Sequence, residues 1–394
     1  MKKLSVIILL ITILSCFFIP SSAVFDGNNS AEVNPKSFSG DFNLQNSVRG
    51  AILCEASTGA ILYSENELAS ASPASVTKIM TLLLVAEALD SGKYSLSDIV
   101  TVSAHAASMG GSQVFLEEGE RISVEDLIKS AVIASGNDAS VALAELTCGS
   151  EAAFVREMNK RAKELRLKAT NFENVTGLDD TTTNHYSCAY DIAIMSRELI
   201  KHDFILNYSS LWQDSIRDGE FILTNTNRLV RYYDGCNGLK TGSTDKAGYC
   251  VSVTAKRGNM QLIAVIMGAN TRDERNAAAR ELLDYGFANF ALYENAGGAV
   301  VNLPVSKGTV SECNLYAKPF STVVEKAKQS AVSFEYEIPE VIIAPKTSGE
   351  VVGKVIYKLD GENVGEADIY LQDDVEKIRY IDIFLGIIKR IICG

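Results

Sequence analysis

Ser75 and Lys78 are the first residues whose types and spacing could do chemistry. They lie in the stretch SPASVTKIMT (72–81), which leads into an apolar run, IMTLLLVAEAL. Pro73 fits the first turn of a helix, so Ser75 is predicted near a helix N-terminus, where side chains three positions apart share a face. Apolar neighbours disfavour the charged form of Lys78 and should lower its pKa. A neutral amine beside a hydroxyl can take its proton, so the pair is predicted to be a nucleophile and its base.

Two further motifs could add polar groups to the same site. Ser135-Gly136-Asn137 is predicted as a tight turn between two helical runs that projects two polar side chains. Lys240-Thr241-Gly242 lies on a strand-like run, where a cation and a hydroxyl face outward and glycine permits close approach of a ligand. Each motif alone has a structural alternative. These alternatives are a lysine that extends from a core helix, an ordinary turn and a solvated strand edge.

In the order SxxK, SGN and KTG, the three motifs resemble those of the penicillin-recognising serine enzymes. Longer stretches are similar to the low-molecular-mass penicillin-binding proteins, which are serine-type D-Ala-D-Ala carboxypeptidases. These stretches are "ASPASVTKIMT", "GGSQVFLEEGERISVEDLIKSAVIASGNDASVALAE", "HYSCAYDIAIMS", "YYDGCNGLKTGSTDKAGYC" and "ELLDYGF". The resemblance runs from roughly Asn46 to Tyr293, and the all-β remainder fits the second domain of that family.

The resemblance implies a role for each motif residue. Ser75 would be acylated by the peptide, Lys78 would be its base, and Ser135 would relay a proton to the leaving D-alanine. Asn137 would orient Lys78 or the substrate amide. Lys240 and Thr241 would bind the terminal carboxylate. The backbone N–H groups of Ser75 and of Ser243, which lies beside Gly242, would form an oxyanion hole.

Three further residues need separate interpretation. Arg275 matches a family arginine linked to carboxylate recognition, and its alternative is a helix-capping surface charge. His185 lies in NHYSCAYD, where no Ser-His-Asp spacing is supported, so a structural histidine is predicted. The family usually has a small hydroxyl residue where Cys188 stands, and no catalytic role depends on that position.

The implied activity is removal of the terminal D-alanine from peptidoglycan pentapeptides through an acyl-enzyme, without a cofactor or metal. β-Lactam antibiotics would acylate the same serine. One alternative is a serine β-lactamase, but the segment from Asn137 to Lys240 contains no E-x-x-x-N or E-x-x-L-N pattern. The other alternative is a catalytically silent wall-binding protein, but the three intact motifs argue against it.

Composition excludes some partners. The chain has 394 residues and a net charge of −12, without a basic stretch, which argues against nucleic acid. The three histidines are scattered and no CxxC or HExxH occurs, so no metal centre is predicted. The strand positions of Cys236 and Cys250 are not expected to be opposite one another, so no disulfide bond between them is predicted.

The motifs require elements that bring them together. A hairpin is predicted over Val48–Tyr63, and strands are predicted between Gly238 and Gly268. Helices are predicted over 75–90, 123–148 and 151–166, and over Arg275–Tyr293. The sequence therefore predicts a mixed α/β, transpeptidase-like domain over 46–296, whose antiparallel sheet unites the two ends of the domain.

The remaining C-terminal segments are predicted to determine where the enzyme lies relative to the membrane. Residues 297–372 contain short strand-like runs about ten residues apart, which indicates a small all-β domain. Residues 373–394 are predicted as an amphipathic helix that lies on the membrane surface, with Lys389 and Arg390 near anionic head groups. The alternative is a helix that packs on the β domain.

The N-terminus reads as an export signal. Residues 1–23 combine two lysines, an apolar run and small residues before a cleavage site, and 24–45 form a polar, turn-rich leader predicted to be flexible. A lipid-attached Cys16 is the alternative N-terminus. Either reading predicts an exported protein at the outer face of the cytoplasmic membrane, in the space of the cell wall.

Overall fold

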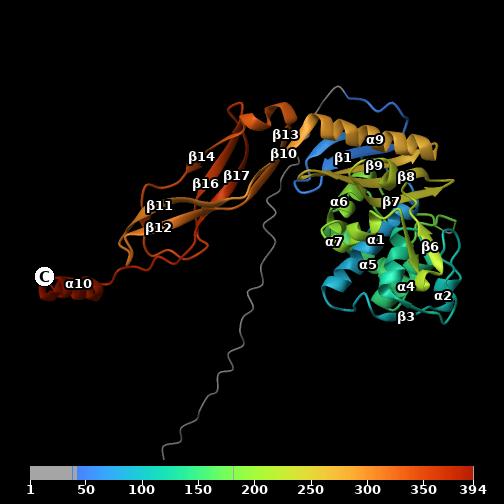
Figure 1. The fold of residues 1–394 in the computed structure, drawn as a ribbon, viewed down its shortest axis with the longest axis horizontal. Coiled ribbons are helices and arrows are strands. Elements are labelled where there is room, and N and C mark those ends of the chain that lie inside the picture. The colour runs from blue at the N-terminus through green and yellow to red at the C-terminus, as the bar shows by residue number, and fades with distance from the viewer. Residues whose placement is uncertain (1–37, 39–41, 181, 394) are drawn as a thin grey trace, which may run out of the picture. The chain divides into compact units, whose positions relative to one another are not determined.

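Five strands from the two ends of the first domain form one antiparallel sheet (Figure 1). The structure is a computed structural model that describes residue 38 and residues 42–180 and 182–393. The strand order is β2-β1-β9-β8-β7. The strands are β1 (Gly50–Glu55), β2 (Ile61–Glu65), β7 (Cys236–Thr244), β8 (Gly248–Arg257) and β9 (Met260–Ala269). Because β1 pairs with β9, the predicted sheet that unites the two ends is confirmed.

Helices cover both faces of this sheet. Alternate residues of β1 are therefore buried on opposite sides of it. Ala51 and Leu53 belong to the apolar cluster that contains α9 (Arg272–Asn289). Ile52 belongs to the second cluster, which contains α1 (Lys78–Asp90). Figure 1 shows α9 on one side of the sheet and α1 with α6 on the other. The sheet is therefore a central layer, and its edge strand β7 carries the third motif.

The predicted helical segments divide where the motifs lie. The segment 75–90 begins as a 3-10 turn, η1 (Ala74–Thr77), and continues as α1. The segment 123–148 forms two helices around the predicted turn at Ser135. The other elements of the domain are α2 (Ala104–Ala107), α3 (Val124–Val132), α4 (Asn137–Cys148), α5 (Glu151–Glu164), α6 (Ala189–Leu199), α7 (Asp203–Ser209) and α8 (Leu229–Tyr232), with the hairpins β3 (Ile99–Thr101)/β4 (Arg121–Ser123) and β5 (Gln213–Ile216)/β6 (Phe221–Thr224).

The last helix of this domain is shorter at its end than predicted. α9 stops at Asn289, and the residues that follow form strand β10 (Phe290–Asn295). β10 pairs antiparallel with β13 (Phe320–Glu325). The predicted helix to Tyr293 is therefore wrong over its last residues, because the alternating apolar residues Phe290 and Leu292 are buried in a two-stranded sheet.

The C-terminal segment contains a six-stranded sheet in the order β14-β16-β17-β12-β11-β15. Its strands match the predicted short runs. They are β11 (Gly298–Ser306), β12 (Glu312–Ala317), β14 (Ser333–Glu337), β15 (Ile342–Ile343), β16 (Val351–Leu359) and β17 (Glu362–Leu371). A separate apolar cluster that includes Leu315, Tyr357 and Ile369 forms its core. The predicted all-β region therefore exists, with the short helical turn η3 (Lys326–Ala331) between β13 and β14.

The C-terminal helix begins later than residue 373. α10 spans Tyr380–Cys393. Val375, which lies within the predicted helical segment 373–394, is instead 1% exposed in the core of the β domain and forms a bridge with Lys346. Ile378 also precedes the helix. Within the residues that the structure describes, no helix is both long and apolar enough to cross a membrane.

The N-terminal predictions are tested only in part. The predicted signal peptide (1–23) and most of the predicted leader lie outside the described residues. Phe42, near the end of the leader, stacks on Tyr285 of α9 at a ring-centroid distance of 4.3 Å. The predicted flexible leader therefore ends before residue 42, where aromatic packing begins.

Candidate active site

Lys78 Nζ contacts residues of the first two motifs. It lies 3.0 Å from Ser75 Oγ, and it donates hydrogen bonds to Asn137 Oδ1 at 2.6 Å and to the carbonyl oxygen of Thr176 at 2.9 Å. Lys78 is the first residue of α1 and its side chain is fully buried. Ser75, Lys78 and Asn137 were predicted to belong to one site, and the structure brings them together. The contact with the Thr176 carbonyl was not indicated by the sequence.

The surroundings of Lys78 favour the neutral amine. Burial is the main cause that holds the pKa of Lys78 well below the ordinary 10.5, and the nearby cation of Lys240 lowers it further. Asp138 acts in the opposite direction. Because no carboxylate hydrogen-bonds Lys78 in the described part of the chain, the amine can accept a proton from Ser75.

A second lysine–serine pair comes from the other two motifs. Lys240 Nζ, on β7, donates to Ser135 Oγ at 2.8 Å and to the Thr241 carbonyl at 3.1 Å. Burial, followed by the charge of Arg275, lowers the pKa of Lys240 to about 7. Ser135 has a φ of 66°, a left-handed conformation that a serine rarely adopts. The turn before α4 therefore directs Ser135 toward Lys240 at the cost of local backbone strain.

Asn137 is fixed by the segment that follows α2. Its Nδ2 donates to the carbonyl of Gly110 at 2.7 Å, and its backbone N–H donates to the carbonyl of Ser112 at 2.7 Å. These two contacts orient the amide so that Oδ1 accepts from Lys78. The neighbouring Asp138 accepts hydrogen bonds from Val114 N and from Leu116 N. The whole 110–116 segment is thus attached to the start of α4.

Gly242 allows β7 to lie directly against the turn that carries Ser75. A Cβ atom at this position would lie 2.8 Å from the backbone nitrogens of Ser75 and Val76 and 2.9 Å from the carbonyl oxygen of Pro73. These atoms belong to the backbone and cannot move aside cheaply. The glycine therefore permits the close approach of protein backbone, and the next residue, Ser243, lines the same cavity as Ser75.

A cavity of about 440 Å³ contains residues of all three motifs, and its side chains include several cations. It is lined by Ser75, Ser112, Ser135, Trp212, Thr224, Asn225, Thr226, Arg228, Thr241, Gly242, Ser243, Arg272 and Arg275. Thr241 Oγ1 donates to Thr226 Oγ1 at 2.8 Å. No acidic side chain lines this cavity among the residues described.

Arg275 is a buried cation, not a surface charge. It is 3% exposed, and its guanidinium donates to Asn276 Oδ1 and to the carbonyl of Cys250. Burial and the charge of Arg272 lower the pKa of Arg275 to about 10. In the described part of the chain no carboxylate pairs with it, so the helix-capping alternative does not apply and the guanidinium can meet an anion in the cavity.

His185 has the contacts of a structural histidine. Its Nδ1 accepts from the backbone N–H of Glu173 at 3.1 Å, so Nε2 carries the proton and donates to Thr77 Oγ1 at 2.8 Å. Burial lowers the pKa of His185 to about 4, and the ring is neutral at pH 7. His185 therefore supports the turn before Lys78, and its described hydrogen bonds do not include Ser75.

The cysteines are structural as well. Cys188 Sγ accepts from the backbone N–H of Asp191 at 3.5 Å and caps α6, which is the task of a small hydroxyl residue at a helix start. Cys236 pairs with Ala255 across the β7–β8 ladder, and both Cys236 and Cys250 are free thiols. The prediction of no bridge between them agrees with this register.

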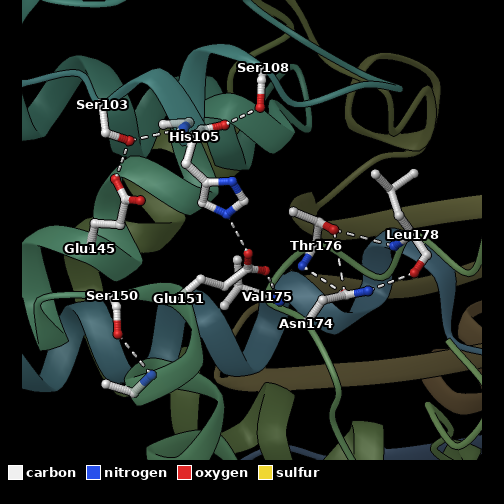
Figure 2. Close-up of polar contacts among 12 residues, drawn as sticks. Ser103, His105, Ser108, Glu145, Ser150, Glu151, Asn174, Val175, Thr176 and Leu178 are labelled. Atoms are coloured by element: carbon white, nitrogen blue, oxygen red, sulfur yellow. Dashed lines mark hydrogen bonds and ion pairs between the residues drawn. The ribbon is translucent and has the colours of Figure 1, made fainter. Parts of the chain in front are cut away.

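The turn that supplies the Thr176 carbonyl was missed by sequence reasoning (Figure 2). Asn174 Oδ1 accepts from Gly177 N at 2.7 Å, and Asn174 Nδ2 donates to the carbonyl of Leu178 at 2.6 Å. Gly177 has a φ of 81°, and a Cβ there would lie 1.8 Å from the carbonyl oxygen of Ala74. The NVTGL stretch was the available signal, since asparagine and glycine at this spacing favour a tight turn. The cavity residues Thr226, Arg228 and Arg272 had no motif to indicate them.

Comparison with protein families gives two matches along the chain. Residues 38–271 match the family described as D-alanyl-D-alanine carboxypeptidase. Residues 287–377 match the family described as the C-terminal domain of penicillin-binding protein 5. The first match contains all three motifs, and Arg275 lies just beyond its end.

Individual relatives and solved structures agree with these matches. The chain is similar to D-alanyl-D-alanine carboxypeptidase DacF of Bacillus subtilis, with 43% identity over 382 residues that cover 95% of each chain. It is 36% identical to D-alanyl-D-alanine carboxypeptidase DacA of Haemophilus influenzae over 335 residues, which cover 82% of this chain and 84% of that one.

Penicillin binding protein 5 from Haemophilus influenzae has a similar structure, with a TM-score of 0.76 and 34% identity, covering 86% of this chain and 100% of that one. Penicillin-Binding Protein D2 from Listeria monocytogenes in the ampicillin-bound form has a TM-score of 0.58 and 31% identity, covering 62% of this chain and all of that one.

Proposed function

The chain belongs to the serine-type D-alanyl-D-alanine carboxypeptidases of low molecular mass, and on that premise we propose that Ser75 is the nucleophile that removes the terminal D-alanine from peptidoglycan pentapeptides. The observation that carries this proposal is the 3.0 Å contact between Ser75 Oγ and the buried amine of Lys78. A serine activated in this way also accounts for acylation by β-lactams, which bind this family.

Acylation would begin when Lys78 Nζ takes the Ser75 hydroxyl proton and Oγ attacks the carbonyl carbon of the penultimate D-alanine. Backbone N–H groups of Ser75 and Ser243 would stabilise the oxyanion, which is supported by the close contact of β7 with the Ser75 turn at Gly242. When the C–N bond breaks, Ser135 would give its proton to the leaving amine. Lys240 would reprotonate Ser135 along their 2.8 Å hydrogen bond.

Hydrolysis of the ester would follow the same route in reverse. Water would take the place of the departed D-alanine and lose a proton toward Ser135 and the now neutral Lys240. Its oxygen would attack the acyl carbon, and the ammonium of Lys78 would return its proton to Ser75 Oγ as the ester bond breaks. The proposal thus uses one lysine–serine pair on each side of the scissile bond, and both pairs end in their starting protonation states.

Recognition of the substrate's terminal carboxylate would depend on the buried cations. Arg275, Lys240 and Thr241 lie in or beside one cavity that no described acidic side chain neutralises. A carboxylate bound there would form charge-assisted hydrogen bonds and offset the unfavourable burial of the guanidinium. Arg228 and Arg272 line the same cavity and would add to its positive potential.

Export and membrane attachment complete the proposal. Residues 1–23 have the pattern of a signal peptide, so the enzyme would act on the outer side of the cytoplasmic membrane. α10 exposes large apolar side chains, among them Phe384 at 58%, Ile391 at 75% and Ile392 at 76%. An exposed apolar helix with Lys389 and Arg390 in its sequence fits attachment to the surface of an anionic bilayer.

The test is a paired assay on residues 24–394. The wild-type protein should release D-alanine from diacetyl-Lys-D-Ala-D-Ala and should be labelled by fluorescent penicillin, and Ser75→Ala should abolish both. A mutant that is still labelled would show that Ser75 is not the nucleophile. Labelling of the wild type without D-alanine release would indicate a silent wall-binding protein. Rapid loss of the label with hydrolysed penicillin would indicate a β-lactamase.

A further inference from the structure

We propose that the hydrogen bond between His105 and Glu151 positions two of the three hydrogen-bond partners of Lys78, so that Glu151 and His105 are positioning residues for acylation. Figure 2 shows the pair between α2 and the start of α5, next to the turn that contains Thr176. His105 Nε2 lies 2.8 Å from Glu151 Oε2. The proposal rests on the role of Lys78 as the base of the proposed function.

The first connection runs from Glu151 to the Thr176 carbonyl. The other carboxylate oxygen of Glu151 accepts from the backbone N–H of Val175 at 3.2 Å. The Val175 carbonyl in turn accepts from Thr81 Oγ1 at 2.7 Å. Both polar backbone groups of Val175 are thus held by side chains, one from α5 and one from α1. The next residue, Thr176, presents its carbonyl to Lys78 at 2.9 Å.

The second connection runs from His105 to Asn137. His105 belongs to α2, whose N-cap Ser103 accepts from Ala106 N and donates to Glu145 of α4 at 2.6 Å (Figure 2). The chain then leads from α2 directly into Gly110 and Ser112. Their carbonyls hold the side chain and the backbone of Asn137, the residue that accepts from Lys78 at 2.6 Å.

The pair therefore joins the segment that holds Asn137, which includes α2 and Gly110, to the turn that supplies the Thr176 carbonyl. Its members are partly solvated, with side-chain exposures of 51% for His105 and 19% for Glu151. A polar contact this exposed adds little to global stability. Misplacement of a reacting group by about 1 Å can still cost roughly 100-fold in rate. The expected signature is a loss of acylation rate without a loss of melting temperature.

The direction of the effect on Lys78 follows from its hydrogen bonds. A carbonyl acceptor stabilises the protonated amine, so misalignment of the Thr176 carbonyl should lower the pKa of Lys78 further. The other charges that act on this amine are those of Lys240 and Asp138, and neither contacts the His105–Glu151 pair. The acidic limb of the acylation profile should therefore move to lower pH while the plateau rate falls.

The experiment measures the second-order rate of acylation by fluorescent penicillin against pH, together with the melting temperature. Glu151→Ala should lower the plateau rate about tenfold and shift the acidic limb to lower pH. Glu151→Gln keeps an oxygen that can accept from Val175 N, so it should retain most of the rate, and His105→Ala should fall between the two. Glu366→Ala removes an exposed ion pair with Lys354 of similar length, 2.7 Å, and should change neither measurement.

Three outcomes would overturn the positioning role. The first is an acylation profile of Glu151→Ala with the plateau rate and the acidic limb of the wild type. The second is an equal loss of acylation rate in Glu151→Gln and Glu151→Ala. The third is a rate loss accompanied by a melting temperature several degrees lower, since that indicates general destabilisation. A wild-type protein that is not acylated in the same assay would instead overturn the proposed function, which keeps the two proposals separate.

Discussion

Lys78 Nζ lies 3.0 Å from Ser75 Oγ, although the two residues belong to different helical segments. Ser75 lies in the 3-10 turn η1, whereas Lys78 is the first residue of α1. The turn is held by His185 through Thr77 and is contacted by Gly242 and Gly177. The serine is therefore fixed from several sides, and its proposed proton acceptor is a lysine whose pKa is lowered by burial.

The rate of acylation should rise with pH through an apparent pKa well below the ordinary 10.5 of lysine. The sign follows from the base role, because Lys78 can take the Ser75 proton only when it is neutral, and burial lowers its pKa. Rates of labelling by penicillin over a pH series would check this. Lys78→Arg should reduce acylation by about 1000-fold or more, since arginine does not lose its proton. Acylation by this variant at the wild-type rate would refute the neutral-base mechanism.

Gly242→Ala should leave a folded protein that is acylated about 100-fold more slowly. The added methyl group would overlap backbone atoms of Ser75 and Val76 at 2.8 Å and would separate β7 from the Ser75 turn, widening the oxyanion hole. Stopped-flow acylation and circular dichroism would measure the two properties. Gly386→Ala is the matched control, because a Cβ there meets nothing within 4 Å. Equal acylation by Gly242→Ala and the wild type would show that the close contact is not needed.

Arg275→Gln should raise KM for the tripeptide substrate far more than it lowers kcat. The guanidinium is 3% exposed and pairs with no described carboxylate, so its proposed partner is the substrate's own carboxylate. Loss of a charge-assisted contact of this kind should reduce kcat/KM by roughly 10- to 100-fold. Arg275→Lys should be intermediate, and Arg280→Gln, an exposed position on the same helix, should have no effect. An unchanged KM in Arg275→Gln would remove this residue from the substrate site.

Two truncations should separate the C-terminal helix from the β domain. A protein that ends at Arg379 lacks α10 and should be folded, active and released from membranes. A protein that ends at Asp373 also lacks Val375, which is 1% exposed in the core, and should lose about 1 to 3 kcal/mol of stability. Fractionation and thermal melts would distinguish the two. If the protein that ends at Arg379 remains with membranes, α10 is not the element that attaches the enzyme.

The sequence alone determined the catalytic motifs and the class of the fold. Ser75 and Lys78 are three residues apart, and one turn of helix brings such residues together without help from the rest of the chain. Alternation and apolar runs likewise gave the strands of the sheet and of the β domain, because those patterns depend on local period and burial. Arg275 could be assigned from sequence only as one of two alternatives, since nothing local distinguishes a buried arginine from an exposed one.

Only the tertiary structure decided how the motifs meet. Lys240 and Ser135 are 105 positions apart and form a 2.8 Å hydrogen bond because the edge strand β7, which packs against η1, meets the turn before α4. The NVTGL stretch favours a tight turn, but the contact of the Thr176 carbonyl with Lys78 could not be predicted from the sequence, since a backbone oxygen has no residue type. Val375 shows the same limit at the other end of the chain: its spacing suits a helix, but the β domain offers it a core, and burial there outweighs local period.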